Sequence, residues 1–179
     1  TLAMRARGLI DSGVPPHHVL LLTFSNRSCD DLKAKLARVA PSVSCRTHHA
    51  HALSILRGSS HPRANATVVE PKDQRALIKA ALMRHSPSAD KEAASKAVRR
   101  LLTMIGKAKA TGVPADLPAK VVEKRCLEDY EEALRSSNQI DFEDMVGLAI
   151  EALRAAPAGG RAPPHSHVLV DEAQDTSER

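Results

Sequence analysis

Residues 167–176 read His167-Val-Leu-Val-Asp171-Glu172-Ala-Gln-Asp-Thr176, a short apolar run that ends in two carboxylates. A continuous apolar run of this length is typical of a strand buried in a parallel sheet. Ligands of open α/β sheets bind at the carboxyl ends of the strands, which is where Asp171 and Glu172 are expected to lie. One carboxylate suits a Mg²⁺ ion, bound directly or through water, and the next suits polarisation of an attacking water. The stretch therefore predicts one half of a nucleotide-hydrolysis site.

The other half of such a site is a phosphate-binding loop of the form Gly-x-x-x-x-Gly-Lys-[Ser/Thr]. No such segment occurs in the 179 residues. The chain opens on Thr1 and stops at Arg179, directly after the carboxylates. We therefore expect it to be a piece of a larger protein, cut at both ends.

The amino-acid composition excludes some classes of protein but does not identify the function. Apolar residues make up 42% of the chain and aromatic residues 2%, so the core must be built from Leu, Val, Ile and Ala. The net charge of +5 is compatible with a polyanion, but the basic residues are scattered. The three cysteines, Cys29, Cys45 and Cys126, form no CxxC pair and fit a reducing compartment. No apolar run approaches the length of a membrane span.

Two more segments predict strands, the apolar run 19–24 and a shorter one near 43–46. About 70 residues of mainly helical pattern follow before the strand that ends at Asp171, so the layout predicts an α/β sheet with a helical insertion. The predicted helices are 2–12, one through Leu32, Leu36 and Val39, 50–56, 71–84, one from Asp90 through Ile105, 118–134, and one from Asp141 through Leu153.

Several polar residues have a structural interpretation that competes with a functional one. Ser25 or Asn26 is expected to cap the helix after the first strand. Asp141 and Asp144 look like a carboxylate pair, but capping of the last helix explains them without catalysis. Lys107 and Lys109 are expected on a solvated helix face.

Four segments, in this order, resemble the UvrD/Rep-type superfamily 1 DNA helicases. They are Leu-Thr-Phe-Ser-Asn-Arg at 22–27, similar to motif Ia; Arg-Thr-His-His-Ala-His-Ala-Leu-Ser-Ile-Leu-Arg at 46–57, similar to motif Ib; Ser-Asn-Gln-Ile-Asp-Phe-Glu-Asp-Met at 137–145, similar to a Leu-Asp-Phe-Asp-Asp-Leu segment; and Val-Leu-Val-Asp-Glu-Ala-Gln-Asp-Thr at 168–176, similar to motif II. Each motif alone is weak, and four in order over nearly the whole chain are strong.

The resemblance implies a RecA-like parallel sheet of the P-loop NTPase type with an inserted helical subdomain. Residues 1–68 and 141–179 would form part of the first motor domain (1A-like), and 69–140 the helical insertion (1B-like). The parent protein would be an ATP-dependent 3′–5′ DNA helicase that moves on single-stranded DNA and opens duplex junctions. The phosphate loop would precede Thr1 and the arginine finger would follow Arg179, so the fragment alone is expected to be inactive.

The resemblance also assigns the chemistry of the nucleotide site, with ATP and Mg²⁺ as cofactors. Asp171 would hold the Mg²⁺ ion and Glu172 would act as the general base. Gln174 would lie near the γ-phosphate and couple hydrolysis to DNA. No residue within this chain is expected to bind the nucleotide through a phosphate loop.

Contacts to single-stranded DNA would come from the two earlier motifs, through Phe24, Asn26, Arg27, Thr47 and His49. A Phe24 ring at the carboxyl end of a strand suits stacking on a base, which contributes roughly 1–3 kcal/mol per base. The competing interpretation is a phenylalanine buried in the core. Arg27 stands where the family usually has Lys, and either residue keeps a positive charge near phosphates.

His48 departs from the family, which has Phe at this position, and this leaves the packing behind the motif Ib loop open. The spacing of His48, His49 and His51 lacks the acids or cysteines of a metal site, so we do not expect one there.

Two other functions remain open at the level of the sequence. One is a truncated relative that binds single-stranded DNA without hydrolysing ATP, and the other is the motor of a helicase–nuclease subunit. A DEAD-box-like RNA helicase is disfavoured, because Ala173-Gln174-Asp175 departs from that motif. An intracellular protein is expected, nuclear in a eukaryote and cytoplasmic in a bacterium. Pathway and oligomeric state stay open.

Overall fold

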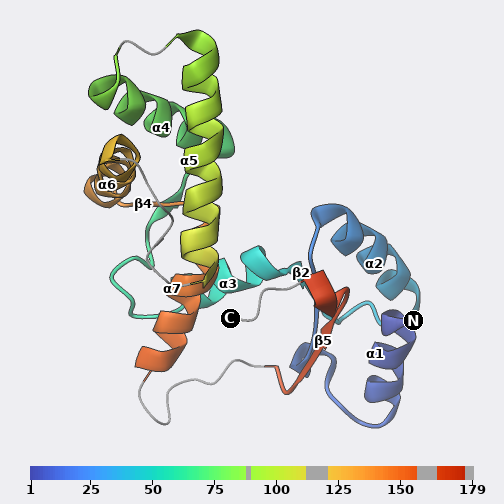
Figure 1. Ribbon diagram of the computed structural model, residues 1–179. Coiled ribbons are helices and arrows are strands. Elements are labelled where there is room, and N and C mark those ends of the chain that lie inside the picture. The colour runs from blue at the N-terminus through green and yellow to red at the C-terminus, as the bar shows by residue number, and fades with distance from the viewer. Residues whose placement is uncertain (88–89, 112–120, 157–164, 176–179) are drawn as a thin grey trace. The chain divides into compact units, whose positions relative to one another are not determined.

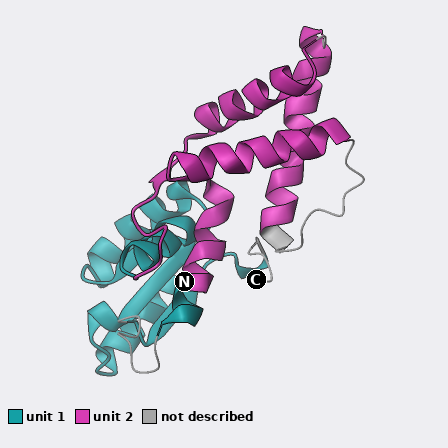
Figure 2. Ribbon diagram, turned by 90° about the vertical axis from the view of Figure 1, so that its left-hand side faces the viewer, with its two compact units in different colours: residues 1–59, 152–178 teal, residues 60–151, 179 magenta. Residues whose placement is uncertain are grey.

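The computed structural model describes residues 1–87, 90–111, 121–156 and 165–175. The chain forms two compact units (Figure 2). We call Thr1–Ser59 with Ala152–Glu178 the sheet unit, and Ser60–Glu151 the helical unit. A small parallel sheet and a majority of helices confirm the α/β class predicted from the sequence.

The sheet unit is built on three parallel strands in the order β2-β1-β5 (Figure 1). They are β1 (Val19–Thr23), β2 (Ser44–Thr47) and β5 (His167–Val170). Leu21 in the central strand lies opposite Cys45 on one side and Leu169 on the other. The three strands predicted from the sequence are therefore confirmed, and they pair in parallel.

Helix α1 (Leu2–Asp11) ends just before Gly13, the stop signal that the sequence predicts. Gly13 adopts a φ of +98°, which an L side chain rarely tolerates. The Gly13 and Val14 N–H groups donate to Ile10 O and Leu9 O, at 2.9 and 3.0 Å, and so satisfy the end of the helix. A 3₁₀ turn, η1 (Pro16–His18), then leads into β1.

Two longer helices follow β1 and β2, namely α2 (Asn26–Val39) and α3 (His48–Arg57). One face of the sheet packs on α1 and α2 through small and aliphatic side chains, as a core without aromatic rings requires. The buried residues of this core include Ala3, Ala6, Val19, Leu21, Cys29, Leu32, Leu36 and Cys45. The predicted stripe of α2 is thus confirmed.

The expectation of a fully buried strand is wrong for β5. Burial alternates along it, and Val168 retains 50% of its exposure while Leu169 packs against the core. Val168 and Val170 are in register with Leu20 and Leu22, so they share the face opposite the α1–α2 core. The strand lies at the end of the three-strand order, and a run of three apolar residues does not reveal that position.

The helical unit holds α4 (Pro71–His85), α5 (Lys91–Thr111), α6 (Val121–Ser136) and most of α7 (Phe142–Ala155). The Ala93 N–H donates to Asp90 Oδ1 at 2.7 Å, which confirms the predicted cap of α5. The core joins α4, α5 and α6 through Ile78, Leu82, Ala94, Leu101, Ile105, Tyr130 and Leu134. The predicted helix start at Pro118 lies outside the described residues.

A second, two-stranded parallel sheet pairs β3 (Thr67–Val68) with β4 (Gln139–Ile140). The Thr67 N–H donates to Asn138 O at 3.0 Å, and the Val69 N–H donates to Ile140 O at 2.8 Å. This pairing was not predicted, because two-residue strands are too short to show alternation. It brings two segments about 70 residues apart side by side within the helical unit.

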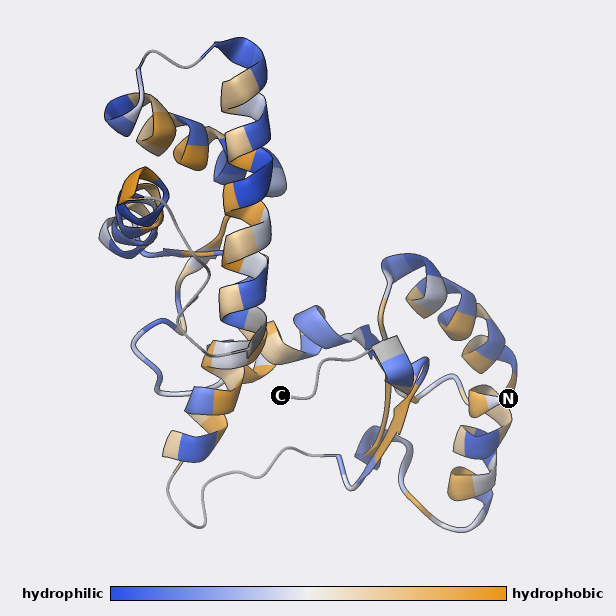
Figure 3. Cartoon of the chain, viewed as in Figure 1, coloured by the Kyte–Doolittle hydropathy of each residue, from blue (hydrophilic) through white to orange (hydrophobic). Residues whose placement is uncertain are grey.

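Apolar residues recur along the helices in separate bands between hydrophilic ones (Figure 3). Accordingly, none of the helices in the described ranges has the length and hydrophobicity that crossing a membrane demands.

Candidate functional site at the carboxyl edge of the sheet

Three segments leave the sheet at the same edge, because the three strands run parallel. They are 24–27 after β1, 47–49 at the end of β2, and 171–174 after β5, and we call them together the carboxyl edge. All the candidate site residues of the sequence analysis lie there, within the sheet unit.

The last two carbonyls of β1 hold the neighbouring segments in place. Leu22 O accepts a hydrogen bond from the Asp171 N–H at 2.9 Å. Thr23 O lies 2.9 Å from His48 Nδ1. Thr23 itself is fully buried, and its hydroxyl donates to Ser25 O at 3.2 Å. The end of the central strand thus fixes the start of all three segments.

Asp171 is half-buried, whereas Glu172 and Gln174 are exposed. Glu172 has a φ of +50°, a left-handed conformation that is uncommon for a residue with a Cβ. The Gln174 side-chain amide donates to the Glu172 carboxylate. Both side chains are thus exposed to solvent and joined to each other just after β5.

These residues fit a nucleotide-bound Mg²⁺ ion in one respect. Nucleotide sites bind Mg²⁺ through one or two carboxylates, substrate phosphates and waters, so a single half-buried Asp171 carboxylate is a sufficient protein ligand. Among the residues with described positions, no three His, Cys, Asp or Glu side chains cluster as an all-protein metal cage would require. The edge suits a metal that arrives with its nucleotide.

Phe24 is 57% exposed at the end of β1, rather than buried in the core. Ser25 caps α2, accepting a hydrogen bond from the Ser28 N–H at 3.1 Å, which decides between the two predicted caps. The Asn26 side chain is therefore not the cap, and both it and Arg27 are exposed. The segment 24–27 therefore exposes a ring, an amide and a cation where β1 passes into α2.

Thr47 caps α3, because its hydroxyl accepts a hydrogen bond from the Ala50 N–H at 3.3 Å. His48 and His49 are half-buried in the first turn of that helix. His51 lies farther along α3, with its ring centroid 5.8 Å from that of His165. Burial, followed by the positive charge of the neighbouring groups, lowers the pKa of both rings, so they are neutral near pH 7.

Two cysteines that look isolated in the sequence meet beneath the carboxyl edge. Cys29 Sγ of α2 lies 3.6 Å from Cys45 Sγ of β2, and both side chains are buried. Burial, together with the hydrogen bond to Cys29, raises the pKa of Cys45 to about 12. The pair is an apolar, unreactive part of the core under the segments that carry the candidate DNA contacts.

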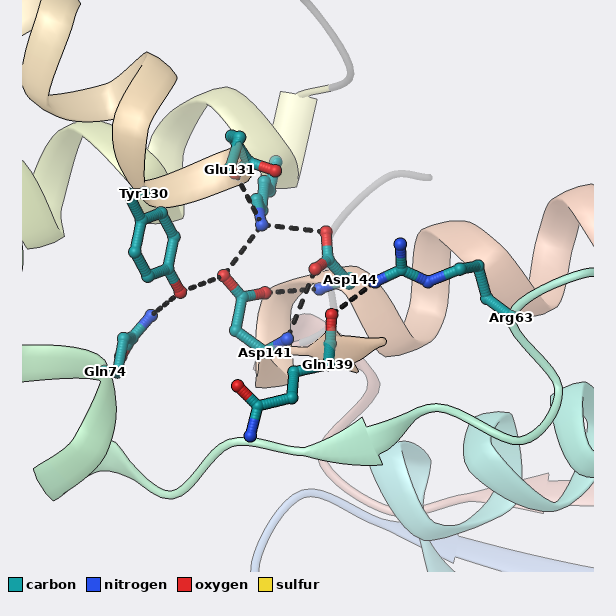
Figure 4. A network of polar contacts seen from close by, with 8 residues as sticks. Arg63, Gln74, Tyr130, Glu131, Gln139, Asp141 and Asp144 are labelled. Atoms are coloured by element: carbon teal, nitrogen blue, oxygen red, sulfur yellow. Dashed lines mark hydrogen bonds and ion pairs between the residues drawn. The ribbon is translucent and has the colours of Figure 1, made fainter. Parts of the chain in front are cut away.

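The helical unit contains a buried polar network around Lys109 (Figure 4), so the expectation of a solvated face is wrong for Lys109, whereas Lys107 is exposed as expected. Lys109 Nζ lies 2.7 Å from Asp141, 2.9 Å from Asp144 and 2.9 Å from Glu131. The Tyr130 hydroxyl donates to Asp141 at 2.7 Å. The spacing of the lysines along α5 gives no sign of this, because the partners are more than 20 residues away.

Asp141 and Asp144 also cap α7, as predicted. The Asp144 N–H donates to Asp141 Oδ1 at 2.9 Å, and the Asp141 N–H donates to Asp144 Oδ2 at 3.2 Å. Burial works against the charge of Lys109, yet the two carboxylates hold its pKa above the ordinary lysine value. Burial and the neighbouring Asp141 raise the pKa of Asp144. The closed network leaves its groups mutually paired, which is typical of a structural role.

Comparison with known proteins identifies the kind of domain. The family model described as the UvrD/REP helicase N-terminal domain matches residues 1–179. The chain is 27% identical to the ATP-dependent DNA helicase UvrD1 of Mycobacterium leprae, over 98% of the chain and 25% of the relative. It is 26% identical to the ATP-dependent DNA helicase PcrA of Leuconostoc citreum, over 94% and 24%. The chain spans about a quarter of the length of these relatives.

Proposed function

The chain belongs to the UvrD/REP helicase N-terminal domain family, and from this premise we propose that it is part of an ATP-dependent 3′–5′ DNA helicase. The observation that carries the proposal is the carboxyl edge, where candidate DNA contacts and a carboxylate pair follow adjacent parallel strands. Coupling of hydrolysis to movement requires the two sites to share a rigid support, which β1 supplies between its neighbours.

In this proposal the nucleotide side of the edge is formed by Asp171, Glu172 and Gln174. Asp171 holds Mg²⁺, and Glu172 polarises the attacking water. Gln174, hydrogen-bonded to Glu172, senses the γ-phosphate. The exposure of Glu172 and Gln174 supports these roles, since both must reach a ligand outside the sheet.

The DNA side is formed by Phe24, Asn26, Arg27, Thr47 and His49. Phe24 stacks on a base, and the exposed Asn26 and Arg27 approach the phosphates beside it. Thr47 and His49 bind the backbone from the first turn of α3, whose amino terminus favours an anion. Single-stranded DNA and duplex junctions are the proposed partners.

We propose a domain organisation in which 1–68 and 141–179 form part of a RecA-like motor domain and 69–140 form an inserted helical subdomain. The parallel sheet with its helices supports the first part, although residues 60–68 and 141–151 pack within the helical unit. The pairing of β3 with β4 supports the second, because it places the two ends of the insertion together.

Both relatives come from bacteria, which favours the cytoplasmic alternative over the nuclear one.

We further propose that the 179-residue chain does not hydrolyse ATP by itself. Hydrolysis needs a phosphate-binding loop and an arginine finger in addition to the carboxylates, and no phosphate-loop motif occurs in this sequence. The expected result is no DNA-stimulated phosphate release by the purified chain. Turnover that disappears in Glu172→Gln would contradict this proposal.

A second candidate, left open by the sequence, is a protein that binds single-stranded DNA without ATPase activity. The two candidates predict the same DNA contacts. They differ in the response to nucleotide: a motor domain joined to its phosphate loop binds ATP through Asp171, and a pure DNA-binding protein ignores ATP.

The two phenylalanines of the chain offer a matched test of the DNA side. Phe24 lies at the carboxyl edge, while Phe142, also exposed at 42%, begins α7 outside it. Phe24→Ala is expected to weaken binding of labelled oligo(dT) by about fivefold to 150-fold, measured by fluorescence anisotropy. Phe142→Ala is expected to bind as the wild type does. Equal affinities of the two variants would remove Phe24 from the proposed contact.

A further inference from the structure

We infer that His48 is a positioning residue that holds the two DNA-facing segments of the carboxyl edge together, an inference that rests on the proposed function. Its imidazole Nδ1 lies 2.9 Å from the carbonyl oxygen of Thr23. Thr23 ends β1, next to the segment 24–27, and His48 begins α3, next to Thr47. The contact therefore joins two segments that are 25 residues apart in the sequence.

The chemistry of this contact fixes the state of the ring. A carbonyl oxygen only accepts hydrogen bonds, so the contact is a bond only when His48 Nδ1 carries the proton. His48 must therefore be the Nδ1–H tautomer when it is neutral. Thr23 is fully buried, and its carbonyl is held beside a second bond, from the Asp171 N–H to Leu22 O. The acceptor is thus rigid, and His48 is the adjustable partner.

The neighbours of His48 show what the bond positions. Thr47 is already committed as the cap of α3, through the Ala50 N–H. The Thr23 hydroxyl donates to Ser25 O, which follows Phe24 in the segment 24–27. With the His48 bond in place, the first turn of α3 and the β1–α2 turn form one surface. Without the bond, the two turns move relative to each other in the free protein. DNA binding must then fix their positions, and this entropic cost weakens the affinity.

Two substitutions separate this role from simple packing. His48→Asn places an amide N–H near the position of Nδ1 and keeps the donor. His48→Leu fills a similar space and removes the donor. His17→Leu, in the exposed 3₁₀ turn before β1, controls for loss of a histidine elsewhere. We expect His48→Leu to weaken oligo(dT) binding about fivefold, and the other two variants to bind close to the wild type.

Nitrogen-15 NMR of the histidine rings tests the bond directly in the wild-type chain. The expected result is the Nδ1–H tautomer for His48. An Nε2–H tautomer, or equal DNA affinities of His48→Leu and His48→Asn, overturns the inference.

A wild-type chain that fails to bind oligo(dT) would refute the proposed DNA role and not this inference. Amide hydrogen exchange at residues 47–50 then decides the positioning role by itself. Faster exchange in His48→Leu than in His48→Asn supports it, and equal exchange overturns it.

Discussion

The thiols of Cys29 and Cys45 show how a single contact changes the chemistry of a residue. Their sulfurs lie 3.6 Å apart in the core beneath the carboxyl edge. The thiolate is the reactive form of cysteine, and burial raises the pKa of Cys45 to about 12. At neutral pH the Cys45 thiol is therefore almost entirely protonated.

We predict that native Cys45 reacts with thiol reagents far more slowly than the same residue in urea. Mass spectrometry of labelled peptides after timed exposure at pH 7.5 measures this, with the unfolded chain as the reference. The reaction should accelerate as the pH approaches 12, because the thiolate fraction grows in that range. Labelling of native Cys45 at the rate of the unfolded chain at pH 7.5 would contradict this prediction, because it would show that the core around the thiol opens readily.

Ser25 marks the limit of residue-level prediction at the carboxyl edge. Ser25 and Asn26 both have side chains that cap helices, and the backbone alone decides between them. The extended conformation of Ser25 brings its hydroxyl to the Ser28 N–H and leaves Asn26 as the first helical residue. The motifs in the sequence were enough to identify the candidate site. Which of the two side chains caps the helix, and that Asn26 is left out of the cap, became clear only from the structure.

At the scale of elements, the strands and helices could be predicted from the spacing of apolar residues wherever they were long enough to show a repeat. The five-residue run of β1 and the stripe of α5 are examples. The two-residue strands β3 and β4 have no period, and the apolar run of β5 does not reveal that one of its faces is exposed. Lys109 was misplaced for a similar reason, since its partners belong to α6 and to the start of α7.

The difference between the central strand and the edge strand predicts unequal sensitivity to substitution. Leu21→Ala in β1 removes a fully buried side chain and should lower the free energy of unfolding by about 2–5 kcal/mol. Val168→Thr in β5 alters a half-exposed position and should change it by about 0.5 kcal/mol or less. Urea denaturation followed by circular dichroism compares the two. A large loss in Val168→Thr would mean that this face is covered.

At the scale of the whole molecule, the described residues form two hydrophobic cores that share no side chain. The sheet unit carries the proposed nucleotide and DNA residues, and the helical unit is held by its own core and by the Lys109 network. A change in that network is therefore expected to act on one unit and spare the other.

Lys109→Met tests this separation. It removes the cation from Asp141, which is only 1% exposed, and leaves a buried carboxylate without its ion pair. We expect the helical unit to lose about 3–5 kcal/mol of stability, seen as faster amide hydrogen exchange in α4 and α6. Exchange in β1 should change little. Lys96→Met, at an exposed position of the same helix, is the control and should leave both units unchanged.

The measurement that tests the central claim most directly is a titration of labelled oligo(dT) of about 16 nucleotides with the wild-type chain. It is read by fluorescence anisotropy without ATP, with salt raised from about 50 to 200 mM. The proposed carboxyl edge predicts saturable binding that weakens steeply with salt and that Phe24→Ala reduces. An anisotropy that stays flat at the lowest salt, for a folded chain, would contradict the proposal that this edge binds single-stranded DNA.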